Sequence, residues 1–567
     1  MKIKRMFLGL MMLSFLIIGV QSYAASFIQS PPLDQVVKTA VGDIKSGQAV
    51  RLPLITWGGD IATILANGNS DITIGGDSIF AKKKLKFKLV REDDFKKQIE
   101  AYLSGQTPFL RGTMGMINMA AEALSRDPRT KPVIIYQMTW SSGGDCLVVK
   151  SGINTAKDLK GKTIVLQAYG PHVDYLAKIL KDAGLSMKDV NIRWVKDLTG
   201  TENSPAEAFY QKEIDAAFLI IPDGLMLTSN GAVGTGAEGS VKGAKILLST
   251  KTANKIIADV YAVRSDYLKN HRPAVQRFVH GLLQAEQQLK TLLKNKESHT
   301  EIYSRMIKFS ARVLLDSEQA TADAEALFGD CTYVGFKGNV KFFGDTKWPR
   351  NMKHLTDEIQ ASLITAKLLN KKVPIKHAKW DYNELKAGLS GVDDVESPRF
   401  KKDAVARVVA KKQAMGTLDE GELFSFEINF KPNQKAFSED LYAAEFKKVI
   451  ELSATYGGAI ITVEGHSDPH KYNKLKKKNA TPIVLKRTKQ AAKNLSMNRG
   501  LAVRKSIIKF AQTNGVPIDE SQFTVIGHGI TQPKYANPGT KEQWLENMRV
   551  VFRIIQIEAE ESVFEPL

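Results

Sequence analysis

The sequence predicts an α/β fold that is extended by helices and followed by a small α+β unit. Three observations lead to this prediction. The composition, with 43% hydrophobic and 25% charged residues, is that of a globular protein and excludes a disordered or collagen-like chain. Short β-like runs alternate with amphipathic helical runs in the front of the chain, and this texture changes twice further on. The length of 567 residues predicts about three folded units, at roughly 100–200 residues per domain.

The amino terminus has the pattern of a secretory signal peptide. A basic segment over residues 1–5 precedes an apolar run over residues 6–20, and small residues follow at Ala24 and Ala25. The apolar run is shorter than the ~20 residues that span a bilayer, which favours cleavage over an uncleaved anchor. We therefore expect residues 1–25 to be removed and the mature chain to reside in the periplasm.

The charge balance is strongly basic. Lys and Arg total 80 against 60 for Asp and Glu, which leaves a formal net charge of +20. Such a charge favours anionic surroundings, for example lipid headgroups, wall polymers or small oxyanions. Because the export signal takes the chain out of the cytoplasm, nucleic acid is not an expected partner.

Cys146 and Cys331 are the only two cysteines. An oxidising compartment would permit them to pair, so a disulfide and two buried thiols remain open alternatives. Two distant cysteines do not supply the ligands that tetrahedral zinc needs, and we predict neither a metal site nor a cofactor.

Strands and helices alternate from about residue 32 to 264. Residues 132–136, 163–166 and 216–221 read as strands, and residues 173–183 read as an amphipathic helix between them. This alternation predicts parallel sheets that bind ligands at the carboxyl ends of their strands.

The chain then becomes helical over residues 273–389, where residues 275–293 show apolar spacings of three and four. Residues 390–420 are polar, basic and interrupted by glycine and proline, which is typical of a linker, here with one short helix over 404–415.

A last unit begins at about residue 421. Its strands and helices alternate as βαβαβ with one further strand, over residues 424–430, 438–456, 459–464, 496–514, 523–526 and 550–557.

Four short motifs lie in order within this last unit. GHSD stands at residues 465–468, LSMNR at 495–499, IGHG at 526–529 and NMRV at 547–550. Together they make residues 421–567 resemble the OmpA-like peptidoglycan-binding domain.

That resemblance implies that Asp468 and Arg499 hold the diaminopimelate of the wall peptide, with Asn547 and Arg549 supplied by the closing motif. The chemistry suits this role, because diaminopimelate carries an ammonium and a carboxylate. Asp468 can accept hydrogen bonds from the ammonium, and Arg499 can bind the carboxylate in a bidentate way. A plain salt bridge between the strand end and the helix start is the alternative.

Two departures from the family pattern affect this site. The gap between the aspartate and LS is expanded to residues 469–494, which hold nine Lys and Arg and no acid, and the family's asparagine before LS is replaced by Ala492. The insertion either adds attraction to anionic polymers or is a solvated loop. The closing motif also has one arginine fewer than in the family.

The front part carries a second set of motifs. They are TWGGD at residues 56–60, SSGGD at 141–145, INTAKDLKGK at 153–162 and EIDAA at 213–217. Through them the chain resembles, over about residues 45–300, the periplasmic substrate-binding proteins of ABC importers, of the nitrate, taurine and thiamine-precursor type. The resemblance implies two α/β lobes with a ligand cleft between them. We expect the two-lobed unit at 26–389, with its second lobe at about 140–225.

One candidate ligand site follows the strand over residues 163–166. There, the turn with Tyr169 and Gly170 leads into a helix at His172, which leaves unpaired backbone N–H groups facing the cleft. This arrangement suits a carboxylate, sulfonate or phosphate. Arg111 and Thr113 open a second helix in the same way, and Arg111 could neutralise an oxyanion.

Further candidates occupy the strand-end turns where the family's ligand contacts lie: Trp57, Asp60, Ser141, Ser142 and Asp223. Alternatives stay open for several of them. Trp57 can pack between lobe and hinge, Arg111 can pair with Asp77 or Asp223, and Asp60, Asp223 and Asp259 can bind an amine.

No catalytic motif is present, since the sequence lacks a nucleophile elbow, an H-E-x-x-H helix and a P-loop. We therefore predict no enzyme. The expected protein is a periplasmic receptor for a small polar solute, with an anion favoured. It is anchored to peptidoglycan, and its expected membrane partner is an inner-membrane permease. The alternative is a wall-anchored sensor or envelope scaffold, associated with a membrane complex or with the outer membrane.

Overall fold

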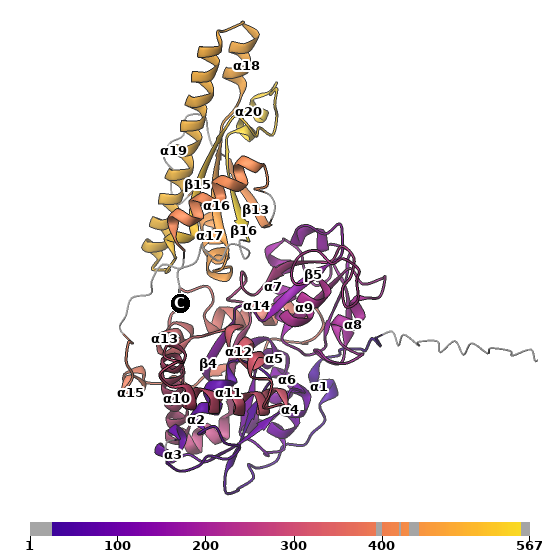
Figure 1. Ribbon diagram of the computed structural model, residues 1–567, viewed down its shortest axis with the longest axis vertical. Coiled ribbons are helices and arrows are strands. Elements are labelled where there is room, and N and C mark those ends of the chain that lie inside the picture. Colours follow the sequence, from indigo (N-terminus) through magenta and orange to yellow (C-terminus); the bar gives the residue numbers. More distant parts are fainter. Residues whose placement is uncertain (1–24, 77, 393–399, 419–420, 430–440, 557–567) are drawn as a thin grey trace, which may run out of the picture.

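The computed structural model describes residues 25–76, 78–392, 400–418, 421–429 and 441–556. Of the predicted signal peptide only Ala25 is among them, so that prediction lies outside the described residues. Two lobes form the front part, residues 25–392, and a carboxyl-terminal domain follows (Figure 1). Within the described residues, no helix has both the length and the hydropathy that a membrane crossing requires.

The first lobe is built on a mixed sheet in the order β11-β4-β10-β3, with β12 added beside β4 and the pair β1-β2 next to it. Its strands are β1 (Val50–Leu54), β2 (Phe87–Arg91), β3 (Phe109–Thr113), β4 (Pro132–Ser141), β10 (Ala258–Arg264), β11 (Cys331–Tyr333) and β12 (Lys376–His377).

The second lobe has a five-stranded sheet in the order β7-β6-β8-β5-β9. Its strands are β5 (Asp145–Val149), β6 (Thr163–Gln167), β7 (Asn191–Val195), β8 (Ala216–Ile220) and β9 (Lys245–Ser249), and its helices are η2 (Ala156–Leu159), α7 (His172–Asp182), α8 (Pro205–Phe209) and α9 (Ile221–Leu227). Because β9 pairs with β5, this sheet continues past the residue 225 that the sequence suggested.

Two chain segments connect the sheet of the first lobe with the sheet of the second. Residues 142–144 lead from β4 into β5, and residues 250–257 lead from β9 back to β10. The strands that enter and leave a lobe run antiparallel to their neighbours, as β5 does against β8 and β10 does against both β3 and β4. The expectation of parallel sheets is therefore correct for β1 with β2 and for β6 with β7 and β8, and wrong for the pairings of β5 and β10.

Helices cover the first lobe and bridge to the second. They are α1 (Leu33–Val36), α2 (Asp60–Ala66), α3 (Ile79–Lys82), α4 (Phe95–Leu103), α5 (Met114–Met119), α6 (Ala121–Leu124), η1 (Pro128–Thr130), α10 (Ser265–Lys294), α11 (Thr300–Leu315), α12 (Thr321–Gly329), α13 (Gly335–Gly344), α14 (Met352–Thr365) and α15 (Tyr382–Lys386). The apolar face of α10 packs on the first lobe, where Phe278 contacts the rings of Phe80, Phe87 and Phe109.

The carboxyl-terminal domain has a sheet in the order β13-β16-β14-β15. Its elements are β13 (Glu422–Asn429), α17 (Ala443–Thr455), β14 (Ile460–His466), α18 (His470–Lys477), α19 (Pro482–Asn514), η3 (Glu520–Gln522), β15 (Phe523–Gly529), α20 (Lys541–Asn547) and β16 (Arg549–Ile555). The observed order matches the predicted one, although residues 438–440 and 557 of the predicted elements lie outside the described residues.

The predicted linker helix belongs to this domain. It is α16 (Lys402–Met415), and its apolar residues, among them Val405 and Val408, form one buried cluster with Ile460, Ile526 and Ile555 of the sheet. A chain segment that is polar on average can therefore still bury one apolar helix face.

The basic insertion is helical rather than a loop. The predicted helix at 496–514 extends back to Pro482, and α18 packs beside this extension. Pro482 stands in the first turn of α19, where its missing N–H costs nothing.

Candidate functional site

A buried charge cluster lies at the first-lobe side of the lobe junction. Arg111 of β3 places Nη1 2.9 Å from Asp259 Oδ1 and Nη2 3.0 Å from Asp60 Oδ2. All three side chains are buried. Asp223 is not the partner of Arg111, and Asp77 lies outside the described residues. The sequence suggested that Arg111 could neutralise a bound oxyanion. In the structure, the carboxylates of Asp60 and Asp259 neutralise the Arg111 guanidinium instead.

Burial dominates the acidity of these carboxyl groups. It raises the pKa of Asp60 to about 7, although Arg111 acts in the opposite direction. The pKa of Asp259 is raised for the same reason. Thr139 donates to Asp259 at 3.0 Å, and Trp57 Nε1 donates to Thr139 Oγ1 at 3.0 Å. Trp57 is therefore hydrogen-bonded to this charge cluster.

A second polar cluster lies where the chain crosses between the lobes. Asp145, the first residue of β5, lies 2.8 Å from His172 Nε2 and accepts a 2.6 Å hydrogen bond from Ser141 Oγ. Thr250 Oγ1 accepts from Ser141 and from the backbone N–H of Gly143. Both crossing segments, 142–144 and 250–257, are thus joined at one point.

Asp145 itself was not among the predicted site residues. It closes the SSGGD segment, and a carboxylate directly after a Gly-Gly turn at a strand start is the sequence feature that could have indicated it. His172 is the first residue of α7, and its buried ring points to Asp145, not to a cleft opening.

Trp57 reaches from the first lobe to the crossing segment. A Cβ added at Gly144 would lie 2.6 Å from the Trp57 ring and 3.2 Å from Asp330 Cβ, so only glycine permits this contact. The backbone carbonyl of Asp330 also accepts a 2.9 Å hydrogen bond from the Ser142 N–H. Burial, together with Asp145, raises the pKa of the Asp330 carboxyl to about 6. Asp330 lies in the helical extension, where the sequence offered no reason to select it.

The other predicted ligand residues have local roles. Thr113 caps α5 by accepting from Met116 N–H at 3.1 Å. Tyr169 has a left-handed backbone, with φ of 61°, and donates its hydroxyl to Pro31 at 2.7 Å. Gly170 is in close contact with Gln167.

Two more of these residues lie near the crossing. Ser142 Oγ is hydrogen-bonded to Thr332 Oγ1, on β11 of the first lobe. Asp223 of α9 is half-buried, which raises the pKa of its carboxyl, and His172 lies close enough to act on it in the opposite direction.

The lobe junction is rich in acid. Asp60 and Asp259 pair with the guanidinium of Arg111, and Asp145 acts electrostatically on both Asp259 and Asp330. An added anion would be repelled by the carboxylates that are ionised, whereas an ammonium or a neutral hydrogen-bond donor would be attracted. The anionic solute that the sequence favoured stays a prediction.

A second site lies at the carboxyl end of β14. Asp468 accepts from Asn547 Nδ2 at 2.9 Å and from the backbone N–H of His470 at 2.8 Å. Arg549 has its Nε 3.3 Å from Glu427 and donates to the Gln532 carbonyl at 3.3 Å. Asn547 and Asp468 are thus brought together, while Arg549 is paired elsewhere.

Close packing positions Arg499 at the same end of β14. A Cβ at Gly465 would lie 2.0 Å from the Ser496 carbonyl oxygen, and one at Gly500 would lie 3.1 Å from the Val463 carbonyl oxygen. These two glycines let α19 approach β14 just before the strand ends and Asp468 follows.

The Arg499 side chain is 2% exposed, and neither its Nε nor its Nη1 has a hydrogen-bond partner among the described residues. Burial lowers its pKa. The described residues show no ion pair between Arg499 and Asp468, so the plain salt bridge is not formed. A buried guanidinium without an anion is costly unless a ligand carboxylate completes it.

Glu464, His466 and His528 are near enough for one metal ion, with ligand atoms within 4.8 Å of one another. However, the two imidazole rings stack at 4.7 Å with an angle of 14°, so their nitrogen lone pairs lie in nearly parallel planes and do not converge. Glu464 is also paired with Arg553 at 2.9 Å. This arrangement does not fit a metal centre. Burial and the nearby Arg549 lower the pKa of His466 to about 3.

Both cysteines are free thiols, Cys146 on β5 and Cys331 on β11. Of the two alternatives that the sequence left open, the disulfide is therefore not formed.

The chain is similar to solved structures of binding proteins and of an enzyme. The periplasmic aliphatic sulphonate binding protein SsuA of Escherichia coli is 16% identical, over 58% of this chain and 90% of that one, with a TM-score of 0.39. The alkanesulfonate-binding protein SsuA of Xanthomonas axonopodis pv. citri, bound to MOPS, is 18% identical over 59% and 100%, also at 0.39. The desulfurization enzyme DSZB is 16% identical over 59% and 98%, at 0.37.

No curated protein matches the chain. A family match covers residues 79–291, which contain β2 to β10 and most of α10, and hence both crossings between the lobes. The matching family model is described as NMT1/THI5 like.

Proposed function

We propose that this protein is a periplasmic receptor that binds a small polar solute between its two lobes and is held non-covalently to peptidoglycan by an OmpA-like carboxyl-terminal domain. The main support for the receptor is the convergence of both lobe crossings on one buried polar cluster, formed by Ser141, Asp145, His172 and Thr250. A solute bound there would act on both crossings at once, which is what opening and closing of two lobes requires.

The surplus of carboxylates at the junction guides the choice of solute. We propose an amine, a zwitterion or a neutral hydrogen-bond donor in place of the anion first favoured, with Trp57 and Asp330 as contacts next to Gly144. Asp60 and Asp259 would act through Arg111, which keeps them in position.

A thermal-shift screen tests this proposal, since a ligand that binds only the folded state raises its apparent stability. The panel contains sulfonates, phosphate, nitrate, amino acids, polyamines and pyrimidines. We expect a rise with a cationic, zwitterionic or neutral compound, and loss of that rise in Asp330→Asn and Trp57→Ala. A response only to anions would contradict the proposed solute class, and no response to any compound would argue against a receptor.

The wall-binding proposal is supported by the unmatched guanidinium of Arg499 beside the Asp468 turn. Asn547 holds Asp468 in place, so its acidic oxygens can meet an ammonium while Arg499 meets a carboxylate. Diaminopimelate carries both groups on one side chain. Arg549 would shape the site through Glu427 without contacting the ligand.

Pull-down with purified sacculi tests the wall site. We expect Asp468→Ala and Arg499→Ala each to abolish retention, and Asn547→Ala to weaken it. Arg504→Ala is the matched control on the same helix, because Arg504 donates to backbone carbonyls of Glu520 and Phe523, away from Asp468. Undiminished retention of both Asp468→Ala and Arg499→Ala would refute the assignment.

A wall-anchored sensor or envelope scaffold is the second candidate. It is favoured by the contact of the carboxyl-terminal domain with the crossing segment 250–257, where the Gly458 N–H donates to the Thr252 carbonyl at 3.1 Å. A solute bound at the crossing could then alter the position of the carboxyl-terminal domain. Neighbouring genes for a permease and an ATPase would favour transport, and genes for a proton channel or an outer-membrane complex would favour sensing.

A further inference from the structure

The insertion in the carboxyl-terminal domain forms a helical hairpin, residues 469–494, that we call the basic hairpin. Its arms are α18 and the first turns of α19, joined by a turn in which Asn479 has a left-handed φ of 53°. The Ala480 N–H donates to the Leu475 carbonyl at 3.1 Å at the end of α18. Lys489 of α19 lies over the Tyr472 ring of α18 at 5.1 Å and joins the two arms.

The basic hairpin projects away from the front part, at the far end of the molecule (Figure 1). The first contacts of α19 with the sheet region are made at Ala492 and Lys493, which lie against Gly529 of β15 and Ser467, so the turns before them extend beyond the sheet. At 1.5 Å per residue, those turns place the tip roughly 15 Å from Ala492.

The charge of the basic hairpin is uncompensated. Residues 469–494 contain no Asp or Glu. None of their nine Lys and Arg side chains forms an ion pair with a described residue. All nine are exposed: Lys471, Lys474, Lys476, Lys477, Lys478, Lys486, Arg487, Lys489 and Lys493. Such a surface attracts a dense negative charge.

Its tip adds two exposed apolar side chains. Ile483 is 66% exposed and Val484 is 41% exposed, in the first turn of α19. Along the chain they lie within a few residues of Lys476, Lys477 and Lys478 at the end of α18. An anionic glycan would use the lysines alone, because it offers no apolar phase. A phospholipid surface offers phosphates for the lysines and an acyl boundary for Ile483 and Val484.

We propose that the tip of the basic hairpin docks on an anionic phospholipid bilayer, with Lys476, Lys477 and Lys478 at the phosphates and Ile483 and Val484 inserted at the acyl boundary. This contact is independent of the solute site and of the Asp468 site.

Vesicle flotation of the full protein tests the proposal, with phosphatidylglycerol in phosphatidylethanolamine compared with phosphatidylcholine alone. We expect binding only to the anionic vesicles. The triple variant K476Q/K477Q/K478Q should bind about a hundredfold more weakly. The matched control is K367Q/K371Q/K372Q, which removes three exposed lysines of the front part and should bind as wild type.

A second pair of measurements separates lipid from glycan. Ile483→Ser with Val484→Ser should reduce vesicle binding about ten-fold, while retention on sacculi stays unchanged. Ile483→Trp should add a fluorescence component that shifts to the blue with phosphatidylglycerol vesicles. Unchanged vesicle binding of the double serine variant, or a tryptophan that stays in water, would overturn the proposal in favour of a polyanion contact. Absence of binding to either kind of vesicle would overturn it altogether.

Discussion

Arg111 is a large cationic side chain with no exposed surface, and Asp60 and Asp259 are the groups that balance it. These two buried ion pairs are costly to break, because removal of one charged side chain leaves its partners buried and charged. Buried groups of this kind decide stability even where they lie next to a ligand site.

Arg111→Met should lower the free energy of unfolding by about 3–5 kcal/mol, since Asp60 and Asp259 would lose their cation. Denaturant unfolding measures this change. Arg129→Met is the control, because Arg129 pairs with Asp43 and Asp127 at the surface, and little change is expected there. An Arg111→Met protein as stable as wild type would show that the buried ion pairs are not needed for folding.

Asp174 of α7 is a second buried acid. It packs against Gly115 of α5, and neither carboxylate oxygen accepts a hydrogen bond from another described residue. Burial raises its pKa from 3.8 to about 7. Because the folded carboxyl holds its proton more tightly than the unfolded one, its contribution to stability is fully present below pH 3.8. That contribution is lost as the pH rises towards 7.

Asp174→Asn should therefore stabilise the protein by about 2–4 kcal/mol at a pH of about 8 and much less at a pH of about 5. Thermal unfolding at both pH values measures the difference. Asp323→Asn, at an exposed position of α12, should change stability little at either pH. Equal effects of Asp174→Asn at both pH values would contradict the raised pKa.

At the scale of elements, α19 shows how one helix serves two environments. Its carboxyl-terminal half buries Val503, Ile507 and Ala511 in the domain core, whereas its amino-terminal turns have no buried side chain before Ser496. The apolar period that predicts a helix is present only in the carboxyl-terminal half of α19, which explains why the sequence indicated a helix from residue 496 onward.

The approach of α19 to β14 should tolerate no side chain at Gly465. We expect Gly465→Ala to destabilise the carboxyl-terminal domain by about 1–3 kcal/mol, because the new Cβ would lie 2.0 Å from the Ser496 carbonyl oxygen. Thermal unfolding followed by Trp544 fluorescence reports on this domain. Gly344→Ala, whose Cβ would meet no atom within 4 Å, is the control. A stable Gly465→Ala domain would mean that the helix can shift freely.

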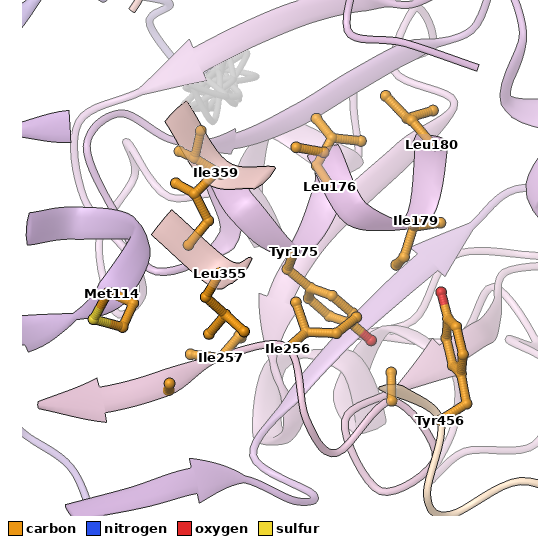
Figure 2. Packing of buried hydrophobic residues seen from close by; sticks show 14 of the residues in the cluster. Met114, Tyr175, Leu176, Ile179, Leu180, Ile256, Ile257, Leu355, Ile359 and Tyr456 are labelled. Carbon is orange, nitrogen blue, oxygen red and sulfur yellow. The ribbon is translucent and has the colours of Figure 1, made fainter. Parts of the chain in front are cut away.

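At the scale of the whole molecule, the carboxyl-terminal domain is docked on the second lobe and the crossing segment 250–257. Tyr456 donates to Asp182 Oδ2 at 2.8 Å, and Gly458 N–H donates to the Thr252 carbonyl at 3.1 Å. Figure 2 shows the Tyr456 ring beside Tyr175 and Ile256. Thr250, two residues before Thr252, is hydrogen-bonded in the candidate solute site. A cavity of about 600 Å³ lies between the two parts, lined by Lys178, Arg350, Glu358, Lys447, Thr455 and Phe510 among others.

Gly458→Ala should undock the domain, because its Cβ would lie 2.0 Å from the Lys251 carbonyl oxygen. We expect a larger radius of gyration in solution scattering, with sacculus binding retained. Gly539→Ala, where the nearest atom is 3.8 Å away, should leave the radius unchanged. A compact Gly458→Ala protein would indicate that the contact in this structure is not needed to hold the two parts together.

Much of the local structure follows from the sequence. The runs at 132–136 and 163–166 lie within β4 and β6, and the run at 216–221 coincides with β8 except for Ile221, which begins α9. The helices α7 and α17 begin and end within a few residues of the predicted ones, apart from residues 438–440, which are not described. Such elements depend on periods of two and 3.6 residues, which a sequence displays directly. The short motifs also indicated Ser141, His172, Asp468 and Asn547, each of which has a polar partner in a site.

The sequence by itself therefore determined which segments are strands and helices, the order of the units and the residue types near each site. Tertiary structure alone decided that Arg111 is matched by residues 51 positions before it and 148 after it, that the two thiols stay apart, and that the carboxyl-terminal domain rests on the crossing segment 250–257. The physical reason is range: periodicity reports on neighbours within a few residues, whereas charge matching and docking depend on where the folded chain brings distant segments together.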